Sequence, residues 1–123
     1  MSQEQITQPI VFRPQNCLDA ETGKAIEAEV AAIAAHRETL FVIDLSEVDL
    51  VDSAGLFALV SGLRTARESA SRLVICNAPP PVRLIFEITQ LDRVLEIFDS
   101  YEAAIATPSR QSAPTKRSGL VAA

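Results

Sequence analysis

The chain has few of the residues from which most active sites are built. It contains one histidine, His36, and two cysteines, Cys17 and Cys76, which lie in different segments and form no Cys-x-x-Cys pair. This spacing does not indicate a metal site, and we do not expect a disulfide. Neither glycine-rich phosphate loop, G-x-x-x-x-G-K-[ST] or G-x-G-x-x-G, occurs. We therefore expect no metal and no cofactor.

Long apolar runs and positive charge are also scarce. The first residues, M-S-Q-E-Q-I-T-Q-P-I, lack the basic start and apolar centre of a secretion signal, and no apolar run approaches a membrane span. Residues 1–106 hold eight basic and all sixteen acidic residues, a net charge of -8. Because such an acidic body repels nucleic-acid phosphates, we expect the protein to bind another protein and not nucleic acid. Without a secretion signal or a membrane span, we expect it to be cytoplasmic and to make no contact with a membrane.

Four short apolar runs predict strands. Leu40–Leu45 and Leu73–Cys76 are nearly continuous, as in strands that are buried on both faces. Ile10–Phe12 and Val94–Phe98 are weaker candidates. Each run is followed by a segment in which the apolar residues recur at a different spacing.

Those other segments have apolar residues at helical spacing. They are Asp19–Arg37, Ser53–Ser69, a stretch that begins at Val82 after three prolines, and Tyr101–Ala106. Because parallel strands need crossover connections, strict alternation predicts an α/β domain. We expect a small, mostly parallel or mixed sheet of four to five strands with alternating helices packed against it.

The segment V-D-S-A-G-L, Val51 to Leu56, places a serine at the start of a predicted helix. A hydrolase nucleophile elbow needs glycine two residues before and two residues after the serine, and Val51 occupies the first position. The single histidine lies at the far end of the preceding helix, so Ser53 has no expected base. We therefore predict no catalytic residue and no enzymatic activity.

Three aspartates, Asp44, Asp49 and Asp52, lie near the end of the strand at Leu40–Leu45. Carboxylates in this arrangement are possible Mg²⁺ ligands, but no further ligand cluster accompanies them. We interpret Asp44 and Asp49 as solvated charges at loop ends.

Two interpretations of Ser53 stay open. Serine and aspartate are both favoured helix N-caps, so Ser53 is either a cap or a spare hydroxyl beside the cap Asp52. A spare hydroxyl there is suited to phosphorylation, because the first turn of a helix favours negative charge. The phosphate would add about 1.5 to 2 negative charges to a patch with Asp49 and Asp52, and would disturb a docked partner without unfolding the domain.

The segment F-V-I-D-L-S-E-V-D-L-V-D-S-A-G-L, Phe41 to Leu56, resembles the hallmark of STAS domains. This family includes bacterial anti-sigma factor antagonists and the cytoplasmic tails of sulfate transporters. C-L-D-A-E-T, Cys17 to Thr22, resembles the segment G-x-L-D-x-x-T that opens the first helix of the family, and P-P-V-R-L-I-F-E-I-T-Q-L-D-R-V-L-E-I-F resembles part of its C-terminal third. We expect one STAS domain over 10–106, a poorly ordered segment 1–9, and a disordered, Ser- and Pro-rich tail over 107–123.

The resemblance implies a phosphorylation-switched binding module. Unphosphorylated members bind an anti-sigma factor that is itself a GHKL-type serine kinase, and so release a sigma factor. Phosphorylated members dissociate from the anti-sigma factor, and a PP2C-type phosphatase removes the phosphate. The alternative is a STAS scaffold in another partner-switching, two-component or lipid-transport complex, without a sigma factor. We expect a monomer or weak dimer.

The resemblance also assigns residues. Ser53 matches the phosphorylated serine, and Asp19 matches an aspartate of the partner-docking surface. The expected partner-binding residues are Asp19, Thr22, Asp52, Ser53, Ala54, Gly55 and Phe57.

The chain departs from the family pattern at three positions. Asn16 stands where glycine is common, and asparagine tolerates a positive φ better than most residues. Ala54 replaces a second hydroxyl, which leaves Ser53 as the sole acceptor in the motif. Phe57 replaces a small residue and is interpreted either as core filling or as a partner-facing side chain. The short N-terminal region also predicts a shortened or lost first strand, with an exposed sheet edge.

Overall fold

The computed structural model describes residues 8–107. The predicted N-terminal segment 1–9 and the tail 107–123 therefore lie almost wholly outside the described residues, and both stay predictions. In chain order the elements are β1 (Ile10–Phe12), β2 (Asn16–Leu18), α1 (Ala20–Ala34), β3 (Leu40–Asp44), β4 (Val48–Val51), α2 (Ser53–Glu68), β5 (Arg72–Cys76), α3 (Pro80–Ile88), the 3₁₀ turn η1 (Leu91–Arg93), β6 (Glu96–Phe98) and α4 (Tyr101–Ala106).

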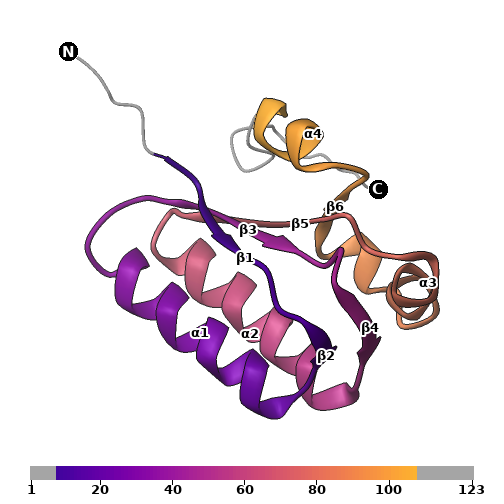
Figure 1. The fold of residues 1–123 in the computed structure, drawn as a ribbon. Coiled ribbons are helices and arrows are strands. Elements are labelled where there is room, and N and C mark those ends of the chain that lie inside the picture. The colour runs from indigo at the N-terminus through magenta and orange to yellow at the C-terminus, as the bar shows by residue number, and fades with distance from the viewer. Residues whose placement is uncertain (1–7, 108–123) are drawn as a thin grey trace.

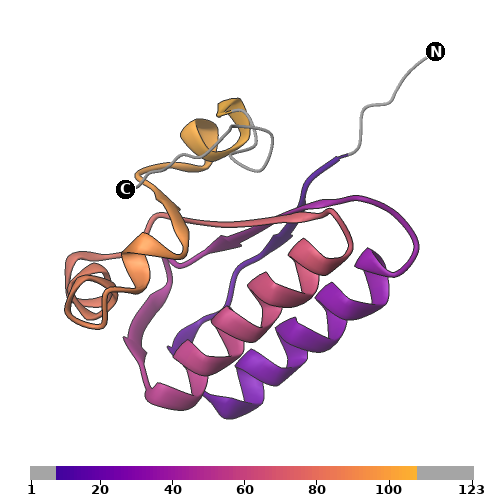
Figure 2. The ribbon, with the colours of Figure 1, turned by 180° about the vertical axis from the view of Figure 1, so that it is seen from behind.

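The main sheet has four parallel strands in the order β1-β3-β5-β6. Figures 1 and 2 show α1 and α2 side by side along one face of this sheet and α4 on the opposite face. The predicted α/β fold, with a parallel sheet covered by helices, is confirmed.

The two central strands carry the core, as their continuous apolar runs predict. On β3, Phe41 and Ile43 belong to the cluster that contains the buried residues of α1 and α2, whereas Val42 packs with Ala104 of α4. Successive side chains of a strand point to opposite faces, so each central strand is buried on both sides.

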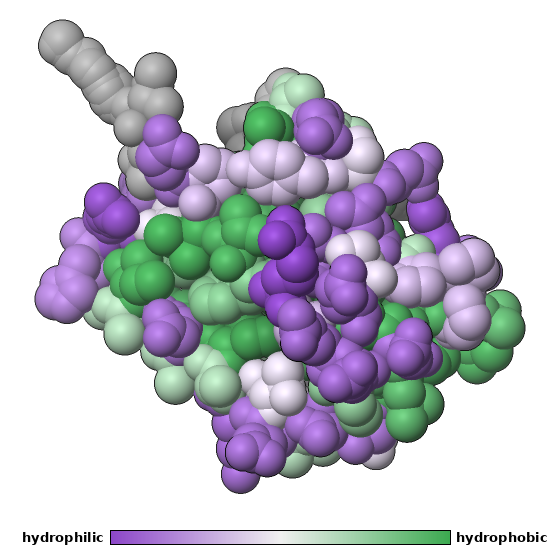
Figure 3. Space-filling model, viewed as in Figure 1, coloured by the Kyte–Doolittle hydropathy of each residue, from purple (hydrophilic) through white to green (hydrophobic). Residues whose placement is uncertain are grey.

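The edge strand β1 is three residues long and pairs only with β3 among the described strands. Its central residue Val11 is 37% exposed. Figure 3 shows apolar surface on the side of the molecule where β1 runs, and more apolar surface over β4 and α3. The first strand is therefore present, and its edge of the sheet is short and partly apolar.

The predicted boundaries of several elements were wrong. Helix α1 ends at Ala34 instead of Arg37, and α3 begins at Pro80 because proline is well tolerated in the first helical turn. Gln90 has a φ of 62°, which ends the helical path before Leu91. The last strand is confined to β6, because the backbone N–H groups of Val94 and Leu95 donate to the carbonyl oxygen of Leu91 and so close the turn of η1.

Asp44 is not the solvated loop-end charge that we expected. It ends β3 and is 4% exposed. Its carboxylate accepts hydrogen bonds from Nε of Arg13 (3.0 Å), the backbone N–H of Ser46 (3.0 Å) and Nδ2 of Asn77 (3.3 Å). Burial alone would raise the pKa of Asp44, but these hydrogen bonds outweigh it and hold the pKa below its ordinary value. Asp44 thus ties the end of β3 to the segments after β1 and β5.

The lowered pKa of Asp44 gives the stability of the domain a pH dependence. The charged form stabilises the fold above the pKa of the unfolded chain, about 3.9, and this contribution is lost as the pH falls through the lower folded pKa. At pH 7 we expect Asp44→Asn to lower the free energy of unfolding by about 1–3 kcal/mol. In urea titrations from pH 7 to pH 2.5 the gap between variant and wild type should shrink; a constant gap would contradict the assignment.

Candidate functional site

Strands β2 and β4, which we did not predict, form a second, two-stranded parallel sheet. Each ends directly before a helix, and their last residues are paired. Asp19 follows β2 and caps α1, with Oδ1 accepting from the N–H of Thr22 at 3.1 Å. Asp52 follows β4 and caps α2, with Oδ1 accepting from the N–H of Gly55 at 2.8 Å. The ladder therefore places two helix N-termini side by side.

The two capping aspartates make this corner negative. The backbone hydrogen bond from Thr22 is the main reason that the pKa of Asp19 lies below its ordinary value. Desolvation, and then the charges of Asp19 and Asp52, raise the pKa of the neighbouring Cys17 thiol. Cys17 is thus a protonated, weakly nucleophilic thiol at neutral pH.

Ser53 is the first residue of α2 and is exposed. Asp52 performs the capping, and within residues 8–107 the Ser53 hydroxyl has no hydrogen-bond partner. Of the two interpretations left open, the geometry excludes Ser53 as the cap. The hydroxyl is free at the surface.

Two glycines allow the elements of this corner to pack closely. A Cβ at Gly55 would lie 2.1 Å from the carbonyl oxygen of Leu18, and a Cβ at Gly23 would lie 2.5 Å from Cβ of Ala58. Gly55 is therefore buried against β2, beneath the surface on which Ser53 lies. Its part in the site is to fix the start of α2.

A cavity of about 340 Å³ lies between the N-terminal ends of α1 and α2. Ser53, Ala54 and Phe57 line it from α2. Phe57 is 72% exposed, so its ring does not fill the core. This surface, which we call the α1–α2 cavity, combines a free hydroxyl with an exposed aromatic ring.

Helix α1 contributes residues to the α1–α2 cavity that the sequence analysis missed. They are Ala20, Lys24 and Glu27. Their spacing of four and three residues marks one helical face and was the signal that could have identified them. Of the predicted set, Asp19 and Thr22 are half-buried beside this face, and their contact is the cap of α1.

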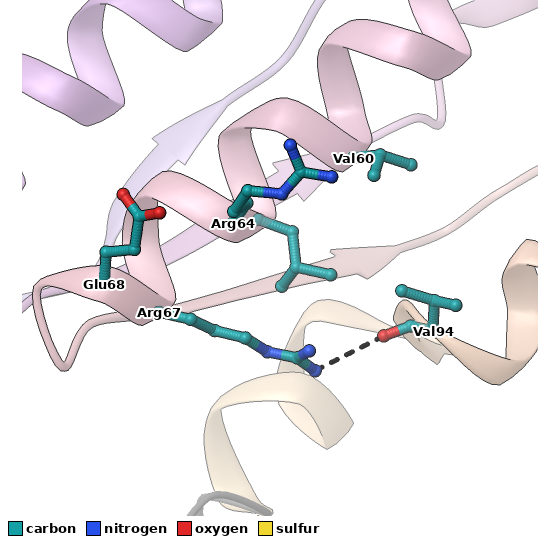
Figure 4. Close-up of a pocket in the computed structure, with 6 residues that line it drawn as sticks. Val60, Arg64, Arg67, Glu68 and Val94 are labelled. Carbon is teal, nitrogen blue, oxygen red and sulfur yellow. Dashed lines mark hydrogen bonds between the residues drawn. The ribbon is translucent and has the colours of Figure 1, made fainter.

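A second, larger cavity of about 400 Å³ lies along the C-terminal half of α2. Figure 4 shows its apolar and charged side chains, with Arg67 donating to the carbonyl oxygen of Val94 at 3.5 Å. None of the predicted site residues lines it.

Within the described part of the chain, no three His, Cys, Asp or Glu side chains gather as a metal site requires. No helix among residues 8–107 is long and apolar enough to cross a membrane.

Comparison with known proteins gives consistent matches. Residues 1–104 match the family described as STAS domain. BtrV of Bordetella bronchiseptica, named as a candidate anti-sigma factor antagonist, is 33% identical over 92 residues, which are 75% of this chain and 79% of BtrV.

Solved structures share the fold. The anti-sigma factor antagonist SpoIIAA in its unphosphorylated form is 22% identical, with a TM-score of 0.68 over 83% of this chain and 90% of SpoIIAA. The phosphorylated form of Bacillus SpoIIAA gives a TM-score of 0.62 at 22% identity, over 84% and 94% of the two chains. A sulfate transporter family protein from Wolinella succinogenes reaches 0.70 at 13% identity, over 79% and 81%.

Proposed function

The chain belongs to the STAS domain family, with relatives at about 30% identity named anti-sigma factor antagonists, and we propose that it is a phosphorylation-switched antagonist of this kind. In its unphosphorylated form it binds an anti-sigma factor and so releases a sigma factor. Phosphorylation of Ser53 ends the binding. The protein itself is a binding module and catalyses no reaction.

The free Ser53 hydroxyl is the observation that carries this proposal. Because Asp52 already caps α2, modification of Ser53 removes no capping hydrogen bond. The side chain is exposed, so a phosphate displaces no core residue. Negative charge is also favoured at a helix N-terminus. The phosphate therefore changes the surface and leaves the fold intact.

The proposed switch is a phosphoryl transfer from ATP held by the partner kinase. Oγ of Ser53 attacks the γ-phosphorus, the bond from that phosphorus to the oxygen bridging to the β-phosphate breaks, and ADP leaves. The hydroxyl proton passes to a base of the kinase. A PP2C-type phosphatase reverses the change with water, which yields inorganic phosphate and restores the hydroxyl.

The α1–α2 cavity supplies the partner surface. Exposed aromatic side chains are enriched among the residues that dominate protein interfaces, and Phe57 is the most exposed large apolar residue within residues 8–107. Ala54 leaves the approach to Ser53 unobstructed by a second hydroxyl. A phosphate at Ser53 brings charge and bound water to this apolar contact.

Phosphopeptide mapping of the protein purified from its own cells tests the proposal. We expect phosphate on the peptide that contains Ser53, lost after phosphatase treatment, and a GHKL-type kinase that copurifies with the unmodified form. The exposed Ser46, seven residues earlier, serves as the internal control and should be unmodified. If Ser53 carries no phosphate under any growth condition, the scaffold alternative replaces this proposal.

A further inference from the structure

We propose that Lys24 binds the phosphate of phosphorylated Ser53 across the α1–α2 cavity. The phosphate then blocks the surface to which the partner binds, in addition to making that surface more negative. This inference rests on the proposed function, because it describes how the switched state is held.

Lys24 and Ser53 line the same cavity from opposite helices. Lys24 is exposed and forms no ion pair with another described residue. At the neighbouring Gly23 the two helices pack closely, since a Cβ there would lie 2.5 Å from Cβ of Ala58. A lysine side chain is long and flexible and carries three donors, so it suits a phosphate on the facing helix.

The charges around the cavity favour this pairing. Lys24 is the one cation among its lining residues, and Glu27, one turn further along α1, is the one anion. The capping carboxylates of Asp19 and Asp52 lie at the two helix starts, with the Cys17 thiol in β2 beside them. A phosphate has up to two charges and three acceptor oxygens, so it competes well with the Glu27 carboxylate for Lys24.

The contact has a structural consequence for the partner surface. A phosphate held by Lys24 spans the cavity above Ala54 and Ala58 and beside the Phe57 ring. The partner then meets a closed ion pair where the unmodified protein offers an apolar recess. Release follows from occlusion of the recess in addition to the cost of burying the phosphate charge in an apolar contact.

The test uses full-length protein with phosphoserine built in at position 53 during synthesis, so that no kinase is needed. The phosphorus-31 NMR titration reports the second pKa of the phosphate, ordinarily about 6. We expect Lys24→Ala to raise this pKa by about 0.3–0.7 units, and Lys24→Arg to restore most of the shift. Arg64→Ala removes an exposed cation elsewhere on α2 and should leave the pKa unchanged.

An unchanged phosphate pKa in Lys24→Ala would overturn the inference. So would an equal shift in Arg64→Ala, because the effect would then be one of net charge alone. Glu27→Gln should lower the pKa, since it removes the competing carboxylate. If Lys24→Ala leaves the phosphate pKa unchanged, the proposal that Ser53 is phosphorylated in cells still stands. If Ser53 carries no phosphate in cells, the contact measured in the synthetic phosphoprotein still stands. The two proposals are therefore tested separately.

Discussion

Ser53→Asp is expected to weaken binding to the anti-sigma factor about 100-fold, because an unpaired charge buried in an interface costs about 2–5 kcal/mol and each 1.4 kcal/mol is tenfold in affinity. The free energy of unfolding should change by less than about 0.5 kcal/mol, as for most surface substitutions. Isothermal titration calorimetry with the copurified kinase, paired with urea denaturation, measures both quantities. Full affinity in Ser53→Asp would contradict the assignment of Ser53 to the interface.

Ser53→Ala is the matched control for this prediction. It should bind the partner in every condition and keep wild-type stability, because the cap of α2 is Asp52. Asp52→Ala removes the cap and should cost about 0.5–2 kcal/mol. A loss of that size in Ser53→Ala instead would mean that the serine has a structural role.

Gly55→Ala should have the largest effect on stability. The added methyl group would lie 2.1 Å from the carbonyl oxygen of Leu18 and 2.7 Å from its carbonyl carbon. Backbone atoms of a paired strand cannot move aside as a flexible side chain does, so α2 must shift away from β2. We expect a loss of about 3 kcal/mol of unfolding free energy, at the upper end of the usual cost of overpacking.

Gly62→Ala, in the same helix, separates steric overlap from helix propensity. A Cβ at Gly62 would meet only Cδ1 of Leu73, at 3.5 Å, which is ordinary contact. Alanine is the better helix former, so this variant should gain about 0.5–1 kcal/mol. Thermal or urea unfolding of both variants gives the comparison, and equal effects would rule out the overlap with Leu18.

The fold was predictable where a pattern is long or continuous. The buried runs of β3 and β5 and the helical spacing of α1 and α2 were sufficient. Strands β2 and β4 were missed because they have three and four residues and, among the described strands, pair only with each other. The two short strands can pair in parallel only because α1 and β3 connect them in the chain. No pattern within either segment therefore predicts the pairing.

The candidate site was predictable mainly through the resemblance to the family. The tolerance of Asn16 at a glycine position is confirmed by its φ of 68°. The two interpretations of Phe57 were separable only by its exposure, since a helical period does not say which face a partner covers. Lys24 escaped notice because Ser53, which lines the same cavity, belongs to another helix.

The β2–β4 ladder links recognition to the order in which the chain folds. Val51 pairs with Leu18, and α1 and β3 lie between the two strands in the chain. Such non-local contacts form late, because loop closure precedes them. Ser53 therefore acquires its neighbours on α1 only in a copy whose first half is complete. A partner of the kind proposed above would therefore bind folded copies of the chain and leave nascent or misfolded copies unbound.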